Sequence, residues 1–326
     1  MSGPDHGPAA APPVDAETQS RSSSPSSARR LTRRRLLLAT GLAGGTGLGI
    51  AVPLLWADSN TGPALHPSAT LTDHTAGVFG VAFSPDGTLL ATAGTDSTVR
   101  LWNVAGRKHI ATLTGHATAV VSATFSPDGR LLATAGQDST VRLWNLDSRQ
   151  QIASFDSRPT WPNSLSFSPD GRTLASPAGD GRASVRLWDV AGHKQIASLT
   201  GHSDSVYDAA FSPDGKAVAT GGRDAWVGVW DVATQRRIAA LHGHTEEISG
   251  VAFSPDGRTL VSADLDGWVR LWDVADGRQI ASVAAHANGV HGLAFSRDGR
   301  MLATTSDHDH WTPAGAGDTV KLWEIR

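Results

Sequence analysis

The stretch FSPDGTLLATAGTDSTVRLWN, residues 83–103, decides the fold, because a near copy, FSPDGRLLATAGQDSTVRLWN, follows at residues 125–145. The motif FSPDG, or FSRDG in the last copy, recurs at spacings of 42, 42, 44, 42 and 42 residues and begins at Phe83, Phe125, Phe167, Phe211, Phe253 and Phe295. Self-similarity at a fixed period predicts one supersecondary unit that is repeated along the chain and stacked on its neighbours.

Each unit is predicted to be a four-stranded sheet. Val81 and Phe83 alternate with smaller residues, which indicates a half-buried strand. Ser84-Pro85-Asp86-Gly87 is a tight turn, because proline presets φ, aspartate can bond its own backbone and glycine takes positive φ. Three further strands are expected at residues 89–92, 99–102 and 109–114. One such sheet cannot bury both of its faces, whereas sheets stacked face to face can.

The chain resembles the WD40 repeat family of β-propellers. The motifs that carry the resemblance are LWD at 187–189 and 271–273, LWN at 101–103 and 143–145, and GH pairs that begin at Gly115, Gly201 and Gly243. The resemblance covers residues 64–326 and implies an all-β fold, a six-bladed WD40 β-propeller. Residues 67–74 mirror residues 109–116, so we expect an N-terminal strand to join the last blade and close the ring.

The resemblance also implies structural tetrads, in which a His, a Ser or Thr, an Asp and a Trp are linked by hydrogen bonds. The matching positions are His74, Thr92, Asp96, Trp102; His116, Thr134, Asp138, Trp144; His202, Thr220, Asp224, Trp230; and His244, Ser262, Asp266, Trp272. The third repeat has Arg158 in place of the His and a displaced Asp180, and the sixth lacks the Asp. Such groups could be mistaken for catalytic triads, but an enzyme needs one site. We therefore expect no catalytic residue, no metal and no cofactor.

A protein or peptide partner is expected, because WD40 propellers usually bind one on the face that carries the loops into the first strands. Candidate positions on that face are Phe79, Gln137, Trp161, Tyr207, Arg223, Glu247 and His291. Aromatic residues and arginine are typical anchors of interfaces. Trp226 and Trp268 fit either packing between blades or partner contact. The net charge of -3 predicts no nucleic-acid partner.

The stretch DHDHWTPAGAGD, residues 307–318, is an insertion between the second and third strands of the last repeat. Trp311 joins the partner-binding candidates, because surface loops often carry function. His308 and His310, with a neighbouring aspartate, leave a metal-binding loop open as an alternative. The alternative functions are a ligand- or metal-sensing propeller, or a propeller hydrolase or lyase.

The N-terminal region predicts a membrane helix. Residues 1–35 form a predicted disordered tail that ends in five arginines, residues 36–57 contain 22 residues without a charge, and residues 58–63 form a linker. A helix needs about 20 such residues to cross a bilayer. Residues 32–37, TRRRLL, resemble a twin-arginine export signal. The basic flank predicts a propeller outside the cytoplasm, anchored to the membrane or released by cleavage. The sequence leaves the oligomeric state open.

Overall fold

The computed structural model describes residues 70–157, 164–178, 184–306 and 319–325, which fall within one compact unit of the chain. They form 23 strands in six antiparallel sheets, and none of them is helical. The prediction of an all-β, six-bladed propeller is confirmed. The predicted tail, membrane helix and linker, residues 1–63, lie outside the described residues. Within these ranges no helix is long and apolar enough to cross a membrane.

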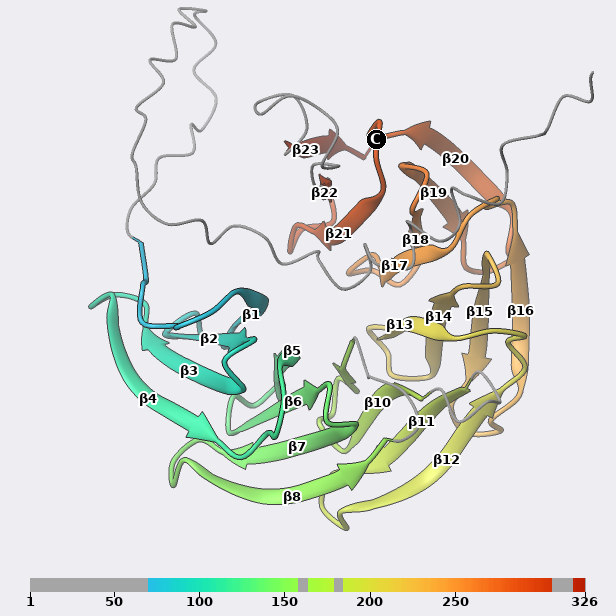
Figure 1. Ribbon diagram of the computed structural model, residues 1–326. Coiled ribbons are helices and arrows are strands. Elements are labelled where there is room, and N and C mark those ends of the chain that lie inside the picture. The colour runs from blue at the N-terminus through green and yellow to red at the C-terminus, as the bar shows by residue number, and fades with distance from the viewer. Residues whose placement is uncertain (1–69, 158–163, 179–183, 307–318, 326) are drawn as a thin grey trace, which may run out of the picture. The chain divides into compact units, whose positions relative to one another are not determined.

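The six sheets are the blades, and they follow one another in chain order (Figure 1). Blades 1, 2 and 3 consist of β1 (Val78–Phe83), β2 (Leu89–Gly94), β3 (Thr98–Asn103), β4 (Lys108–Thr114); β5 (Val120–Phe125), β6 (Leu131–Gly136), β7 (Thr140–Asn145), β8 (Gln150–Asp156); and β9 (Ser166–Phe167), β10 (Thr173–Ala178), β11 (Ser184–Asp189), β12 (Lys194–Thr200).

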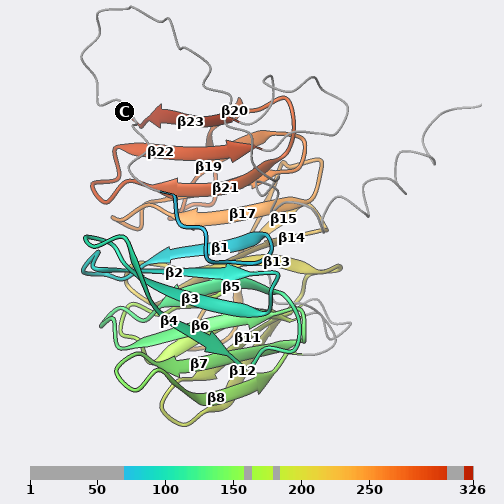
Figure 2. The same cartoon turned by 60° about the vertical axis from the view of Figure 1, so that its left-hand side comes forward.

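The second half of the chain repeats this plan. Blades 4, 5 and 6 consist of β13 (Val206–Phe211), β14 (Ala217–Gly222), β15 (Trp226–Asp231), β16 (Arg237–His242); β17 (Ile248–Phe253), β18 (Thr259–Asp264), β19 (Trp268–Asp273), β20 (Gln279–Ala284); and β21 (Val290–Phe295), β22 (Met301–Ser306), β23 (Thr319–Glu324). The strand order within each blade follows the sequence, as the view of blade 1 in Figure 2 shows. The described part of blade 6 has three strands.

The FSPDG motif turns the chain from the first strand of a blade into the second. In blade 1 the Gly87 N–H donates to the Ser84 carbonyl at 2.8 Å, and Gly87 has a φ of 72°. The Asp86 carboxylate accepts the Thr88 N–H at 3.0 Å, so it holds the turn from its own side chain. The equivalent glycine of every other repeat has a φ between 70° and 72°. The repeated motif therefore reflects a repeated backbone requirement.

Five hydrophobic clusters fill the seams between consecutive blades. In the first seam, Ala123 and Phe125 on β5 pack with Val99 and Leu101 on β3. The motif phenylalanines of blades 2 to 5 are only 7–9% exposed because each enters such a seam. Burying both faces of each sheet in this way is what the stacked-repeat prediction requires.

Two apolar faces at the ends of this series are not covered. On β1, Val81 is 65% and Phe83 is 63% exposed, and on β23, Val320 is 61% and Leu322 is 64% exposed. The equivalent residues of the first seam, Ala123, Phe125, Val99 and Leu101, are all buried. Residues 70–77, which include most of the predicted closing strand, form no strand. Closure of the ring therefore stays a prediction.

Candidate partner-binding face

Three blades contain the predicted tetrad. In blade 2, His116 Nε2 lies 2.9 Å from Thr134 Oγ1, which also accepts the Trp144 indole N–H at 2.8 Å. His116 Nδ1 lies 3.0 Å from Asp138 Oδ2. Equivalent contacts join His74, Thr92, Asp96 and Trp102 in blade 1, and His202, Thr220, Asp224 and Trp230 in blade 4. These polar groups satisfy one another inside the blade.

Blade 5 takes its carboxylate from Asp264, and not from Asp266 as the repeat spacing predicts. His244 Nδ1 lies 2.6 Å from Asp264 Oδ2, and His244 Nε2 lies 2.6 Å from Ser262 Oγ. Ser262 in turn accepts the Trp272 indole N–H at 2.8 Å. Asp264 is fully buried, whereas Asp266 is exposed. The tetrad of blade 5 is therefore complete with a carboxylate that comes two residues earlier.

The position of Asp264 explains how this exchange is possible. Asp264 pairs with Ile248 across the sheet, as Gly222 pairs with Val206 in blade 4. In blade 2, a Cβ at the equivalent Gly136 would come within 2.4 Å of His116 Nδ1, so an added side chain points straight at the histidine. In blade 5 that side chain is itself the histidine's partner. The signal in the sequence is an aspartate where blades 1, 2 and 4 have glycine.

Blades 3 and 6 show partial tetrads. In blade 3 the Trp188 indole N–H donates to Ser176 Oγ at 2.8 Å, while Arg158 and Asp180 lie outside the described residues. In blade 6, Thr304 Oγ1 lies 2.8 Å from His286 Nε2 and accepts the Trp323 indole N–H at 3.0 Å. The tryptophan-to-hydroxyl contact is therefore common to all six blades.

The tetrads shift the ionisation of their members. Burial alone would raise the pKa of Asp96, but hydrogen bonds from Thr98, His74 and the Thr75 N–H outweigh it and lower the pKa to about 2. Burial lowers the pKa of His116. The shift of His116 favours a neutral imidazole in blade 2, and the shift of Asp96 favours a charged carboxylate in blade 1.

A polar network spans blades 4 and 5 and brings together three of the predicted partner-binding residues. The Tyr207 hydroxyl donates to Glu247 Oε2 at 3.0 Å, and Arg223 Nε donates to Glu247 Oε1 at 3.2 Å. Asp204, which the repeat pattern did not single out, lies 3.7 Å from Arg223 Nε. Glu247 thus joins a tyrosine and an arginine from the neighbouring blade. We call Tyr207, Arg223, Glu247 and Asp204 the blade 4–5 network.

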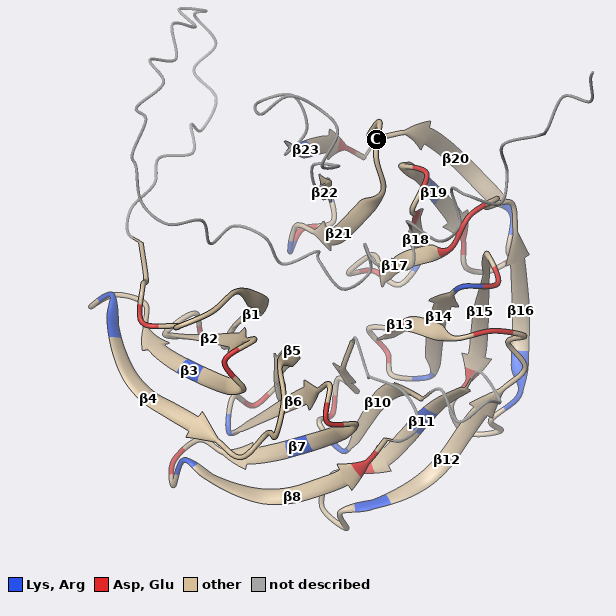
Figure 3. Cartoon of the chain, in the orientation of Figure 1, with Lys and Arg blue, Asp and Glu red and all other residues tan. Residues whose placement is uncertain are grey.

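The network carries more acid than base. Figure 3 shows acidic segments before β13 and before β17, and a basic segment directly after β14. The charge of Asp204, followed by that of Glu247, raises the pKa of Arg223 despite its partial burial. Burial, with the Glu247 charge, raises the pKa of Tyr207 above its usual range. Tyr207 therefore stays a neutral hydrogen-bond donor, and the arginine stays charged.

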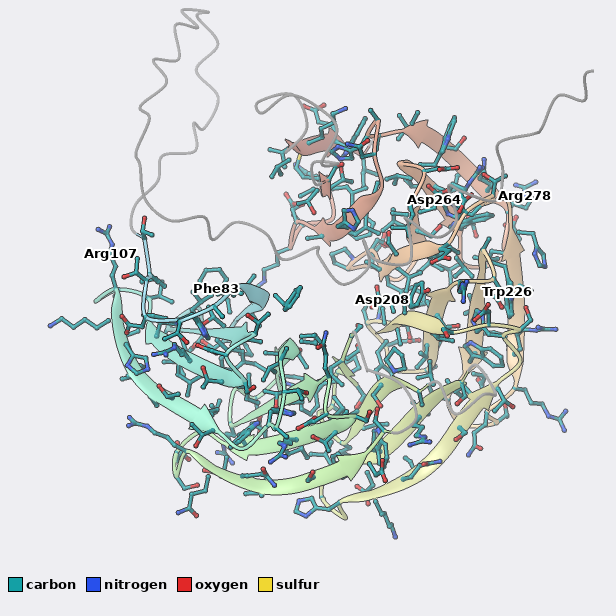
Figure 4. All side chains as sticks on the ribbon, in the orientation of Figure 1. Phe83, Arg107, Asp208, Trp226, Asp264 and Arg278 are labelled. Carbon is teal, nitrogen blue, oxygen red and sulfur yellow. The ribbon has the colours of Figure 1, made fainter. Side chains whose placement is uncertain are left out.

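Asp208 lies on β13 next to this network (Figure 4). Its Oδ2 atom accepts the Val251 N–H of blade 5 at 2.8 Å, and its Oδ1 atom accepts the Ala209 N–H at 2.9 Å. Ser164 of blade 3 hydrogen-bonds to the same carboxylate. The repeat pattern did not single out Asp208 as a binding residue, although the other repeats have Gly or Ser at its position.

The remaining partner-binding candidates do not join this network. Phe79, Gln137 and His291 are half-buried and belong to blades 1, 2 and 6. Trp161 and Trp311 lie outside the described residues, as do His308 and His310 of the insertion. In the ranges that the structure describes, no three His, Asp or Glu residues form a group that could hold a metal ion.

The two additional tryptophans differ from each other. Trp226 is 8% exposed, stacks on His202 with ring centroids 4.0 Å apart, and donates its indole N–H to Asp224 at 2.6 Å. It therefore packs within the blade. Trp268 is 38% exposed, and its described ring contact is with Arg270, whose guanidinium carbon lies 5.7 Å from the ring centroid. Only Trp268 presents its ring to solvent.

A comparison with known families matches the description "WD domain, G-beta repeat" at residues 65–103, 107–145, 149–189, 193–231, 235–273 and 277–324. The chain belongs to the WD40 repeat family. Each matched segment after the first contains the outer strand of one blade and the three inner strands of the next. One curated relative is Ribosome assembly protein 4 of Chaetomium thermophilum, which is 46% identical over 56 residues, 17% of this chain and 10% of that protein. This WD40 chain therefore matches only a tenth of that relative's length.

Proposed function

We propose that this WD40 propeller is a non-catalytic scaffold that binds a protein or peptide on the face carrying the blade 4–5 network. The observation that supports it best is the convergence of Tyr207, Arg223 and Glu247 from two blades. Tyrosine and arginine are frequent anchors of protein interfaces. WD40 propellers suit protein interaction, and the repeated His, Asp and Ser or Thr groups are occupied in structural hydrogen bonds.

The proposal extends to the location of the propeller. We propose that residues 36–57 anchor the chain in a membrane with the propeller outside the cytoplasm. The support is the uncharged run and the five arginines that precede it. A fusion of residues 1–62 to a reporter should place the reporter outside the cytoplasm. A reporter found in the cytosolic fraction would contradict the location and leave the scaffold proposal standing.

We further propose that blade 6 and blade 1 close the ring, with residues 67–74 as the outer strand of blade 6. The chain enters blade 1 as it enters blade 2: the Thr75 N–H donates to Asp96 at 3.1 Å, as the Ala117 N–H donates to Asp138 at 2.9 Å. In blade 2 the preceding residues are the outer strand β4 of the previous blade. The same entry into blade 1 supports an outer strand on blade 6.

Site-specific photo-crosslinking in cells that naturally produce the protein tests the scaffold function. A photoreactive residue at Glu247 should capture a defined partner. The matched control is the same residue at Ile238, which is 61% exposed on the outer strand β16 of the same region. Equal capture at both positions, or none at Glu247, would contradict binding on the network face.

A further inference from the structure

Asp208 differs from every other residue on the innermost strands of the blades. The first strands β1, β5, β9, β13, β17 and β21 contain no other carboxylate. In the neighbouring blade 5 the equivalent residue is Gly250, and Asp208 Oδ2 lies 3.7 Å from the place where a Cβ of Gly250 would stand. The carboxylate of Asp208 thus lies directly against the backbone of β17.

The contacts of Asp208 connect three consecutive blades. It receives the Val251 N–H from blade 5 at 2.8 Å and a hydrogen bond from Ser164 of blade 3, while its own backbone belongs to blade 4. Val251 lies on the first strand of its blade, which pairs with β18 alone. The Val251 N–H therefore lies on the inner edge of its sheet, where no neighbouring strand pairs with it, and Asp208 accepts its hydrogen bond.

Among the described residues, the groups that hydrogen-bond to Asp208 are uncharged. They are two backbone N–H groups and one hydroxyl. The nearby charged or titratable groups are Tyr207 on the same strand, Glu247 before β17, Arg223 after β14 and Asp204 before β13. These four bind one another in the blade 4–5 network. Arg223 therefore pairs with Glu247 and Asp204, whereas the described hydrogen-bond partners of Asp208 carry no charge.

We propose that Asp208 is a pH-sensitive latch between blades 4 and 5, which positions Tyr207 and Glu247 on the proposed partner-binding face. Burial makes the ionised carboxyl the costlier form in the closed seam, so the protonated carboxyl is the form that the closed seam between β13 and β17 holds best. When the pH rises and the carboxyl loses its proton to solvent, its poorly hydrated charge favours opening of the seam. Tyr207 and Glu247 stand on either side of the same seam, so their contact loosens with it.

The desolvation of this site places the change at an unusual pH. Burial outweighs the hydrogen bonds from Ser164, Val251 and Ala209 and raises the pKa of Asp208. An exposed aspartate titrates near pH 3.9. The latch therefore changes state above the ordinary carboxylate range, whereas the pKa values of the tetrad aspartates Asp96, Asp138 and Asp224 are lowered.

The chain offers a specific probe, because Tyr207 is its only tyrosine. We would label tyrosine with ¹³C and follow its NMR signal in the full chain as a function of pH, without any partner. The proposal expects the signal to shift with a midpoint above about pH 4. In D208N, which keeps an acceptor for Val251 but cannot ionise, that shift should be lost.

Two further variants keep the interpretation decisive. E247Q removes the titration of Glu247 and should leave the transition in place, so a transition lost in E247Q and kept in D208N would overturn the proposal. S164A removes one donor to the ionised carboxylate and should move the midpoint upward. If D208N does not fold, an unchanged midpoint in S164A would overturn the proposal. The role of the latch in partner binding rests on the proposed function. The pH transition itself is tested without a partner, so the two can fail separately.

Discussion

The seam between blades 4 and 5 and the faces of blades 1 and 6 contain the same kinds of residue in different surroundings. Phe253 fills the blade 4–5 seam and is 9% exposed, whereas Phe83, at the same position of the repeat, is 63% exposed. Each is the last residue of the first strand of its blade and directly precedes the same turn. Burial of the motif phenylalanine therefore depends on the preceding blade and not on its own blade.

The tetrads depend less on the neighbouring blades. In blade 5, Asp264 is fully buried and His244 is 8% exposed. In blade 1 the side chains of His74 and Asp96 are 6% and 7% exposed, although the face of β1 is uncovered. A tetrad is thus shielded from water largely by its own blade.

The largest expected effect is on a tetrad tryptophan inside a filled seam. Trp230 is 2% exposed, packs in the seam between blades 3 and 4, and donates to Thr220 at 2.8 Å. Trp230→Ala should lower the free energy of unfolding by about 3–5 kcal/mol. Denaturant unfolding followed by circular dichroism measures this change. Ile238→Ala, on an exposed position of the same blade, should stay within about 0.5 kcal/mol, and equal losses in both variants would contradict the filled seam.

The second prediction tests whether blades 6 and 1 pack against each other, as the other pairs of consecutive blades do. If blades 6 and 1 pack together in solution, Phe83→Ala should cost about 3 kcal/mol, close to the cost of Phe253→Ala. If the face of β1 stays exposed, the cost should be below about 0.5 kcal/mol. The matched pair, measured by the same denaturant unfolding, sets the scale because Phe83 and Phe253 occupy equivalent positions.

A pair of introduced cysteines tests whether β1 and β23 lie close enough for a disulfide bond. The chain contains no cysteine, so the double variant V81C/L322C carries only the introduced pair. A disulfide forms when the two Cα atoms come within about 7 Å. The matched control is L101C/A123C, at the equivalent positions of the filled blade 1–2 seam. An intramolecular bond in both variants supports closure, and a bond between chains in V81C/L322C alone contradicts it.

The third prediction concerns the displaced carboxylate of blade 5. Asp264→Ala leaves His244 Nδ1 without its partner at 2.6 Å in a fully buried site. The expected loss is about 1–3 kcal/mol. Asp266→Ala, at the exposed position that the repeat spacing favours, should cost less than about 0.5 kcal/mol. A larger loss for Asp266 than for Asp264, measured by thermal unfolding, would reverse the assignment.

The repeat period was sufficient to predict most of the fold, because each blade has the same structural requirements. A turn that needs Pro, Asp and Gly, and a tryptophan that needs a hydroxyl, leave their marks at constant spacing. The period predicted six blades and the tetrads of blades 1, 2 and 4. It failed at Asp264, because spacing from Trp272 selects Asp266 and contains no information about which side chain reaches His244.

The binding face could be predicted only in part. The family pattern proposed Tyr207, Arg223 and Glu247, but their contact depends on how β17 lies beside β13, which no local motif encodes. Asp208 was missed because it occupies a position where the other repeats have Gly or Ser, and Asp204 because its position varies among Ala, Thr, Glu and Asn. A charged residue at a small-residue position was the available signal, and it marks the seam at which blades 3, 4 and 5 are joined.

The smallest expected effect is an acid-dependent loss of stability at blade 1, beside the uncovered face. Hydrogen bonds from Thr98, His74 and the Thr75 N–H outweigh the effect of burial and hold the pKa of Asp96 at about 2, below its ordinary value of 3.8. Because the folded pKa is the lower one, the stabilisation is present above about pH 4 and is lost as the pH falls towards about 2. Asp96→Asn should therefore show a weaker fall of the melting temperature across that window than the native chain.

Asp208→Asn should show the opposite pH dependence. Because burial raises the pKa of Asp208, its ionisation opposes folding, so the melting temperature of the native chain should fall relative to that of Asp208→Asn as the pH rises. Parallel melting curves of the two variants against pH would contradict this contrast between a carboxylate paired within its blade and one desolvated between blades.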